Sequence, residues 1–473
     1  MVFSSHIFIF YFLALILGAY YFSPRRLKHL VLTLGSYLFY AWWNPWFVLL
    51  MIASTIIDFL CGKIIFNSTP EKAQRKIGLL ISIAANLSIL GFFKYGNFFA
   101  ENVSILARSI GLGEIVLPEF FNKIILPIGI SFYTFQSMSY TIDIYRKKAL
   151  PAENFLTFAC YVSMFPQLVA GPIVRYSDIA KQLKSRIHSA GSFIYGFTRF
   201  NYGFAKKILL ANPVGEIADL CFSAGQSSLN TTAAWIGVIC YAFQIYFDFS
   251  AYSDMAIGLG RMFGFTFREN FESPYKSGSI TEFWRRWHIS LSSFLKDYLY
   301  IPLGGNRKGT SRTYVNLIIV MFLGGLWHGA QWTFVIWGLI HGSILVIERI
   351  SRKNKLGGKL PRPIKVLLTF IIIIIGWVFF RAENINIALN YLSKMFGVGE
   401  SGQSAGILLG QVTRPMACFM MLISCFAIFV MPNTGNCLKK LTKLKVILGL
   451  LLFVFSISVM FAQDFNPFLY FQF

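Results

Sequence analysis

Residues 313–348 read TYVNLIIVMFLGGLWHGAQWTFVIWGLIHGSILVIE. Two apolar runs, 313–327 and 332–348, flank the small and polar residues of GGLWHGAQW (Gly324–Trp332). At about 1.5 Å per helical residue, each run is slightly too short to cross roughly 30 Å of hydrocarbon. We therefore expect a helical membrane protein in which the junction, with His328, lies within the thickness of the membrane.

The composition of the whole chain agrees with this interpretation. Of the 473 residues, 56% are hydrophobic and only 13% are charged, which is about half the charged fraction of an ordinary soluble domain. The 50 Phe, 22 Tyr and 10 Trp residues exclude an intrinsically disordered chain. The net charge of +23 comes from short basic clusters between apolar segments, which argues against a nucleic-acid-binding domain. The pattern predicts an all-α polytopic membrane protein.

A series of apolar segments along the chain is expected to span the membrane. These segments are approximately 6–22, 29–43, 46–62, 77–93, 124–143, 192–211, 233–258, 313–327, 332–348, 365–380, 415–431 and 446–462. Lys and Arg stay on the cytoplasmic side of membrane proteins, and the loops at 23–29, 63–76, 349–365 and 439–445 are basic. This distribution predicts an extracytoplasmic N-terminus. No separate soluble module is evident, so we expect a single membrane domain over residues 1–473.

The middle of the chain departs from simple spans. Phe155–Ile173 is apolar, but its second half, FPQLVAGPI (Phe165–Ile173), contains helix-breaking prolines and a glycine. Because basic residues flank it on both sides, we interpret it as a re-entrant segment, whose irregular backbone must be buried in protein. The basic, Trp-rich stretch 261–312 predicts short helices at the cytoplasmic interface that partly enter the fold.

Two carboxylates lie inside an apolar helical run, YFDFSAYSDMAIG (Tyr246–Gly258). Asp248 and Asp254 are six residues apart, or about 240° around a helix, so they do not form one pair on one face. Ionisable groups in membrane helices are costly unless they have partners. We expect each carboxylate to accept hydrogen bonds from a nearby Arg or from backbone, with a proton-relay role as the alternative.

A second cluster of chemically active residues is FWRRWHISLSSFLKDYLYIPLGGNRKG (Phe283–Gly309). Its cationic and imidazole side chains are Arg285, Arg286, His288, Lys296, Arg307 and Lys308. Such a set suits a ligand that carries phosphate, since Arg binds phosphate oxygens bidentately. The alternative is that these are ordinary positive residues of a cytoplasmic interface. No Walker A or dinucleotide-binding fingerprint is present, which argues against a nucleotide on a standard glycine loop.

The imidazole of His328 is the strongest candidate for a general base. A neutral imidazole takes a proton near neutral pH, and the glycines around it let a substrate approach closely. The alternative is a histidine packed between two tryptophans. His341 lies thirteen residues further on, about 20 Å and 220° away if the helix is continuous, so we expect it to be structural. No set of Cys, His, Asp and Glu has metal-ligand spacing, and the seven cysteines suggest no disulfide framework.

Taken together, these motifs resemble those of the membrane-bound O-acyltransferases. YFDFSAYSDMAIG, FWRRWHISLSSFLKDYLYIPLGGNR and GGLWHGAQWTFVIWGLIHG are most similar to the bacterial branch that acetylates alginate and other exopolysaccharides. Their order and spacing, with LVAGPI upstream, extend the likeness over essentially the whole chain. The resemblance implies a ring of about 11–12 tilted transmembrane helices with re-entrant segments and an internal tunnel, and a catalytic core at about 124–348.

The family pairs the histidine of a WHG-like motif with a polar residue about forty positions upstream. In this chain these positions are His328 and His288, which are forty apart. The resemblance therefore implies that His328 is the general base and that His288 holds the acyl group or the acceptor. Arg285, Arg286, Arg307 and Lys308 are then the expected contacts for the phosphates of an acyl donor.

The activity implied is transfer of acetyl from cytoplasmic acetyl-CoA towards an extracytoplasmic polysaccharide or a relay protein, in the bacterial plasma (inner) membrane. Acetyl-CoA is then a substrate, and no bound cofactor or metal is expected. A second reading within the same fold is D-alanyl transfer from a carrier protein to teichoic acid. A third, of another class, is a proton-coupled transporter that uses Asp248, Asp254 and His328. Transporters commonly contain two matching halves, which this sequence lacks.

Overall fold

The computed structural model describes residues 1–69, 72–112, 124–169, 171–353, 360–399, 402 and 404–463, and within these ranges it contains helices and no strands. The chain divides into two compact units. Unit 1 comprises Met1–Gly196 and Leu259–Phe267, and unit 2 comprises Phe197–Gly258 and Arg268–Phe473. The protein is therefore all-α, as the composition predicts.

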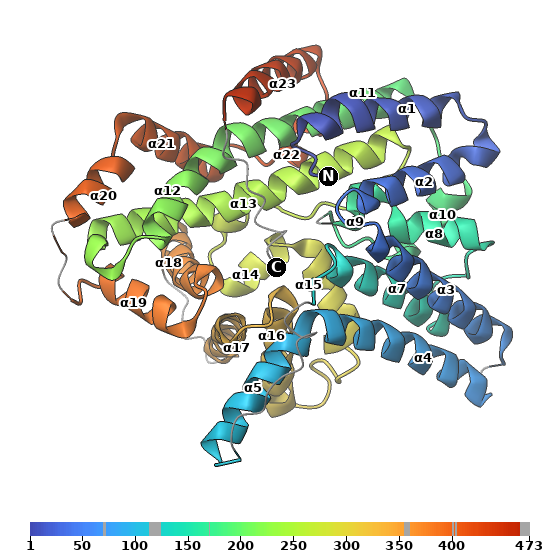
Figure 1. Cartoon of the computed structure of the whole chain (residues 1–473), viewed down its shortest axis with the longest axis horizontal. Helices are drawn as coiled ribbons and strands as arrows, with labels where there is room; N and C mark the ends of the chain where they lie inside the picture. Colours follow the sequence, from blue (N-terminus) through green and yellow to red (C-terminus); the bar gives the residue numbers. More distant parts are fainter. Residues whose placement is uncertain are drawn as a thin grey trace. The chain divides into compact units, whose positions relative to one another are not determined.

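Unit 1 is built mainly from short and medium-length α-helices over its described residues (Figure 1). They are α1 (Leu13–Phe22), α2 (Lys28–Ala41), α3 (Trp46–Asn67), α4 (Ala73–Leu90), α5 (Gly96–Ser109), α7 (Ile130–Tyr145), α8 (Phe155–Ser163), α9 (Phe165–Leu168), α10 (Tyr176–Lys184) and the start of α11 (Ala190–Ala205).

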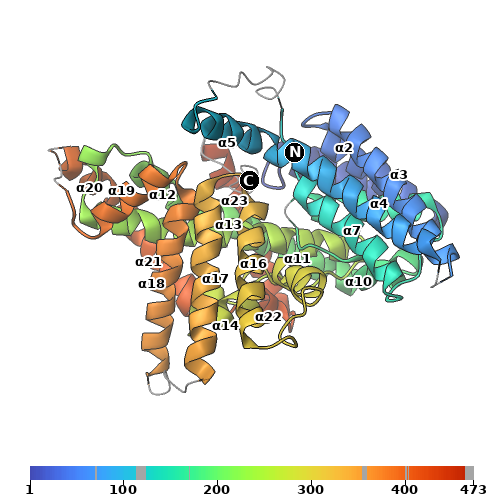
Figure 2. The same ribbon diagram turned by 90° about the horizontal axis from the view of Figure 1, so that it is seen from below.

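Unit 2 contains the remaining helices. They are α12 (Asn212–Phe222), α13 (Thr231–Met262), α14 (Ile280–Arg286), α15 (Ile289–Leu295), α16 (Thr310–His328), α17 (Trp332–Lys353), α18 (Arg362–Arg381), α19 (Ile385–Met395), α20 (Ser404–Val412), α21 (Pro415–Phe429), α22 (Thr434–Leu438) and α23 (Lys443–Ala462). Figure 2 shows α17 lying between α16 and α18.

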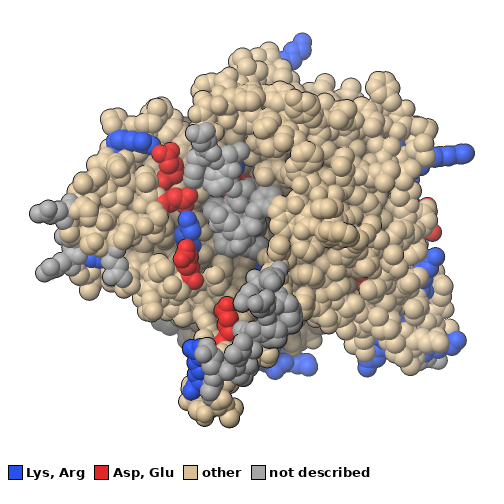
Figure 3. Space-filling view, viewed as in Figure 1, with Lys and Arg blue, Asp and Glu red and all other residues tan. Residues whose placement is uncertain are grey.

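Every predicted span overlaps a helical segment, but fewer of these helices are long and apolar enough to cross a bilayer alone. In the described part of the chain six qualify, or seven if α20 and α21, which meet at a 54° bend, form one span. The six are Trp46–Asn67, Ala73–Ser109, Thr231–Met262, Trp332–Ser351, Arg362–Arg381 and Lys443–Ala462. The second of these joins α4 to α5 through a π-helical segment, Gly91–Tyr95. Helices at the other predicted spans are shorter or more polar. The face shown in Figure 3 carries few charged side chains, and its Lys and Arg residues lie mainly at the margin, as expected of a multi-pass membrane protein.

The segment predicted to be re-entrant is a pair of short buried helices. Asn154 caps α8 by accepting a hydrogen bond from the Thr157 backbone N–H at 2.8 Å. α8 ends at Ser163, Met164 separates the two helices, and Pro166 lies in the first turn of α9. Gly129 stands in a left-handed conformation, and a Cβ there would lie 2.7 Å from the Leu168 carbonyl oxygen, so only glycine fits. The broken, buried backbone agrees with the sequence prediction.

The helical hairpin of α16 and α17 positions the site in unit 2. A Cβ on Gly325 would lie 2.3 Å from the Phe334 carbonyl oxygen, and a Cβ on Gly338 would lie 2.4 Å from that of Met321. These glycines let the two backbones pack in contact, as small residues commonly do between membrane helices. The turn occurs at 329–331, so the run from His328 to His341 is not one continuous helix.

Candidate functional site

A cavity of about 740 Å³ opens in unit 2, and we call it the histidine cavity. Its walls come from α14, α15, residues 296–307, α16 and α17. His328 and Trp337 line it together with four cationic side chains, Arg285, Lys296, Arg307 and Arg349. None of its lining residues is acidic in the described part of the chain. The space is therefore large enough for an organic ligand and biased towards a negatively charged one.

His328 is the last residue of α16 and is 3% exposed. Its ring centroid lies 5.0 Å from that of Trp327, 5.2 Å from that of Trp337 and 5.0 Å from that of Phe380. After it, Gly329 leaves the helix in an extended conformation, and a Cβ there would lie 2.1 Å from the Phe334 ring. The aromatic side chains fix the imidazole at the cavity wall and shield it from bulk water.

His288 lies next to Trp327 but does not line the histidine cavity. It is fully buried, with ring centroids 5.9 Å from Trp327 and 4.7 Å from Phe249. Its Nδ1 is 3.2 Å from the amide oxygen of Asn270. Burial lowers the pKa of His288 to about 3, so the ring is neutral at physiological pH. The structure thus brings both histidines against the same tryptophan.

The four cations expected to bind phosphate separate into two pairs. Arg285 and Arg307 line the histidine cavity. Arg286 instead forms an ion pair with Glu282 at 2.7 Å on the same helix, α14. Lys308 folds back over the turn, so that a Cβ on Gly304 would lie 2.9 Å from its Cδ. Neither Arg286 nor Lys308 is among the residues that line the cavity.

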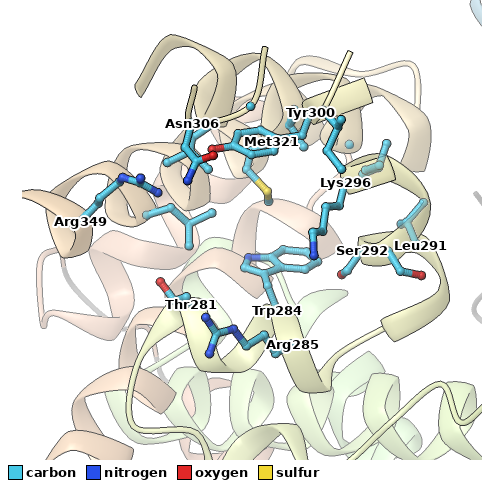
Figure 4. Close-up of a pocket in the computed structure, with 18 of the residues that line it drawn as sticks. Thr281, Trp284, Arg285, Leu291, Ser292, Lys296, Tyr300, Asn306, Met321 and Arg349 are labelled. Atoms are coloured by element: carbon cyan, nitrogen blue, oxygen red, sulfur yellow. The ribbon is translucent and has the colours of Figure 1, made fainter. Parts of the chain in front are cut away.

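Two cavity cations are not among the residues that the sequence names as donor contacts. Lys296 belongs to the basic set that suits a phosphate-bearing ligand, but it is not one of the four named contacts. Arg349 was counted only as a positive residue of a cytoplasmic loop, although it lies on α17 and lines the cavity. Figure 4 shows Arg349 and Asn306 on one side of the space, Lys296 on the other and Trp284 between them. The sequence signal available was the basic end of an amphipathic helix, which does not reveal what that end faces.

His341 lies closer to the site than a continuous helix would allow. Its ring is 4.9 Å from that of Trp337 and 5.4 Å from that of Trp284, both of which line the cavity. Because Trp337 also contacts His328, one indole separates the two imidazoles. The premise of a single helix is wrong here, since α17 begins only at Trp332. His341 supports the aromatic wall and does not itself line the cavity.

The carboxylates of α13 have ionic partners in unit 2. Asp254 accepts hydrogen bonds from Arg199 at 2.8 and 3.1 Å and from Lys206 at 2.7 Å, and Asp248 pairs with Lys207 at 2.6 Å. Arg199 also donates to Glu269 at 2.6 Å. We call this set the ion-paired cluster. The expected stabilisation by a nearby Arg is confirmed for Asp254, whereas the lysine partners were not foreseen.

Metal ligation has no obvious place in this arrangement. Within the described residues no three His, Cys, Asp or Glu side chains are grouped so as to hold a metal ion. The chemistry available at the histidine cavity is that of an imidazole base beside a cationic, aromatic-walled space. Such a site can deprotonate a hydroxyl and bind a phosphate-bearing molecule.

Comparison with known proteins agrees with this chemistry. The model of the membrane-bound O-acyltransferase family matches residues 146–382. The chain is 42% identical to the probable alginate O-acetylase AlgI of Pseudomonas putida, over the full length of both proteins. It is 36% identical to the peptidoglycan O-acetyltransferase of Helicobacter pylori, over all of this chain and 98% of that protein. It is 28% identical to the teichoic acid D-alanyltransferase of Streptococcus thermophilus, over 50% of this chain and 62% of that protein.

Proposed function

Because this chain belongs to the membrane-bound O-acyltransferase family and is an O-acyltransferase, we propose that it transfers acetyl from acetyl-CoA to a hydroxyl group on an extracytoplasmic glycan or relay protein. The observation that carries the proposal is the histidine cavity. There a buried imidazole and four cationic side chains face one space, where a thioester and the phosphates of its carrier can be held together.

His328 is the proposed general base. As the acceptor hydroxyl oxygen attacks the thioester carbonyl carbon, the imidazole of His328 takes the hydroxyl proton. The tetrahedral intermediate then collapses, the carbon–sulfur bond breaks, and the thiolate leaves and recovers a proton. The products are an acetyl ester and free CoA. A thiolate is a good leaving group, so the step requires no strong general acid.

The cationic walls are the proposed site for the donor's phosphates. Arg285, Arg307 and Arg349 carry guanidinium groups that match phosphate oxygens bidentately, and Lys296 adds a point charge. The aromatic wall excludes water from the thioester. These cations belong to the basic stretches 261–312 and 349–365, and the positive-inside rule supports entry of the donor from the cytoplasm.

The proposed acceptor is inferred from the proteins that are similar to this chain. Two proteins similar to this chain over its full length are named for alginate and peptidoglycan O-acetylation, so we propose a polysaccharide acceptor, reached directly or through an extracytoplasmic relay protein. The basic loops at 23–29, 63–76, 349–365 and 439–445 support an extracytoplasmic N-terminus. The apolar helices support a location in the bacterial inner membrane. D-alanyl transfer from a carrier protein is the second candidate, because a D-alanyltransferase is similar over half of the chain.

Release of CoA from acetyl-CoA by the purified protein in detergent tests the proposal. We expect slow turnover by the wild type and a fall of about 10²- to 10⁴-fold in His328→Ala. His6→Ala, which replaces an exposed histidine in unit 1, is the matched control and should behave as wild type. Discharge of a D-alanyl carrier protein without use of acetyl-CoA would favour the second candidate. Equal turnover by His328→Ala and the wild type would remove His328 from the mechanism.

A further inference from the structure

Asn270 stands at the centre of the hydrogen bonds around His288. It is 1% exposed, and its amide oxygen lies 3.2 Å from His288 Nδ1, 3.1 Å from the backbone nitrogen of Ser290 and 2.9 Å from the Ser290 hydroxyl. Its amide nitrogen lies 3.2 Å from the hydroxyl of Ser253. The backbone carbonyl oxygen of Asn270 also accepts a hydrogen bond from the backbone N–H of Ile289 at 2.9 Å. One buried residue therefore holds both the ring of His288 and the chain that follows it.

The orientation of the Asn270 amide follows from these neighbours. A backbone N–H only donates, so the group that faces Ser290 N must be the amide oxygen. The other end of the amide meets a serine hydroxyl, which can donate or accept and so accommodates the amide nitrogen. The reverse orientation would set two donors against each other at 3.1 Å in a buried place, which is costly.

The protonation of His288 follows in turn. Its Nδ1 lies 3.2 Å from the Asn270 amide oxygen, which only accepts, and 3.4 Å from the Ser290 hydroxyl, which donates its proton to that same oxygen at 2.9 Å, so Nδ1 carries the proton. A neutral imidazole has one N–H, and Nε2 is then left with a lone pair. His288 has a backbone φ of 43°, a left-handed conformation that is unusual for a residue with a side chain. The hydrogen bonds that Asn270 accepts from residues 288–290 hold it there.

We propose that Asn270 is a positioning residue that fixes His288 as the Nδ1–H tautomer, so that Nε2 of His288 can accept but not donate a hydrogen bond. The proposal rests on the acyl-transfer function proposed above. It narrows the role of His288, because a ring nitrogen that accepts cannot donate a hydrogen bond to the thioester carbonyl.

The tautomer can be observed without any assay of activity. The chain has only 6 histidines, so selective ¹⁵N labelling of histidine gives few ring signals, and those of His288 are assigned by their loss in His288→Gln. We expect the wild-type ring to be protonated at Nδ1. In Asn270→Leu the ring should lose this single state, whereas Asn270→Asp, which keeps an accepting oxygen, should retain it. Ser253→Ala, the control at the other end of the amide, should leave the ring signals unchanged.

Kinetics provide the second measurement. In Asn270→Leu we expect turnover to fall about tenfold with the KM for acetyl-CoA unchanged, and we expect turnover to recover in Asn270→Asp. Protonation of wild-type His288 at Nε2, or unaltered ring signals and turnover in Asn270→Leu, would overturn the proposal. If Asn270→Leu does not fold, the wild-type and Asn270→Asp spectra still decide the tautomer. Absence of acetyl transfer by every form would reject the proposed function and leave that result standing.

Discussion

Unit 2 contains two groups of charged and polar side chains that differ in what faces them. In the ion-paired cluster, Asp254 meets Arg199 and Lys206 directly, and the space beside them is only about 10 Å³. In the histidine cavity, four cations face an open space of about 740 Å³ with no acidic residue among its described lining. The charges of the ion-paired cluster are neutralised by other side chains of the protein, whereas the histidine cavity has space for a ligand.

The comparison distinguishes charged side chains that stabilise the fold from charged side chains that are available to a ligand. A buried ionisable group in a membrane domain suggests function by default, and by that rule Asp248 and Asp254 are candidates as strong as His328. Direct ion pairs give both carboxylates a structural role. What distinguishes the histidine cavity is that its cations surround a space rather than a carboxylate. The following substitutions should affect one group and spare the other.

The largest effect is expected in the ion-paired cluster. Asp254→Ala removes the carboxylate partner of the part-buried Lys206 and leaves the buried Arg199 paired with Glu269 alone, which costs about 3–5 kcal/mol of stability. Thermal unfolding in detergent should show this loss, while the folded fraction keeps its specific activity. A variant that stays as stable as the wild type but no longer releases CoA would assign Asp254 to the chemistry instead.

The next effect belongs to the cavity. If the donor's phosphates bind as proposed, Arg285→Gln should remove one charge-assisted contact of about 1.5–3 kcal/mol, and the KM for acetyl-CoA should rise roughly ten- to hundredfold. Stability should be unchanged. Steady-state kinetics over a range of acetyl-CoA concentrations provide the measurement, and an unaltered KM would remove Arg285 from the donor site.

A third substitution tests the hairpin that shapes the cavity wall. Gly338→Ala places a methyl group 2.4 Å from the Met321 carbonyl oxygen, which should separate α16 from α17 and cost about 1–3 kcal/mol. Both stability and turnover should fall, because His328 stands on the displaced helix. Gly410→Ala on α20, where no atom lies within 4 Å of the added Cβ, is the matched control. Equal behaviour of the two variants would contradict the close packing.

The smallest effect is expected at Arg286, the neighbour of Arg285. It pairs with Glu282 on a partly exposed helix face, so Arg286→Gln should change stability by no more than about 1 kcal/mol. The KM for acetyl-CoA should stay within twofold of wild type, since the side chain does not line the cavity. A rise as large as that of Arg285→Gln would mean that net charge, rather than position, binds the donor.

Much of the helical fold and part of the candidate site could be predicted from the sequence, because apolar runs and their breaks are local features. The helices at the predicted spans, the broken segment near Pro166 and the placement of His328 in a buried junction all follow from composition and helix length. The spacing of His288 and His328 carries the resemblance to the family, and the structure places both rings beside Trp327.

Contacts between helices could not be predicted in the same way. Arg285 and Arg286 are adjacent and chemically identical, and only the packing of α14 decides that one faces the cavity and the other Glu282. Arg349 reaches the site because α17 folds back along α16, which depends on the glycines of the hairpin. Lys206 and Lys207 pair with α13 from another helical segment, and no periodicity within either segment indicates the partner.

Equilibrium binding of CoA tests the central claim most directly, because CoA carries the phosphates of the proposed donor and has no acetyl group to transfer. Calorimetry would compare CoA with pantetheine, which lacks the phosphates. The account predicts that CoA binds at least tenfold more tightly than pantetheine, and that this advantage is lost when Arg285 and Arg349 are both changed to Gln. Equal affinity for the two ligands, or an advantage that survives loss of both arginines, would contradict a donor site at the histidine cavity.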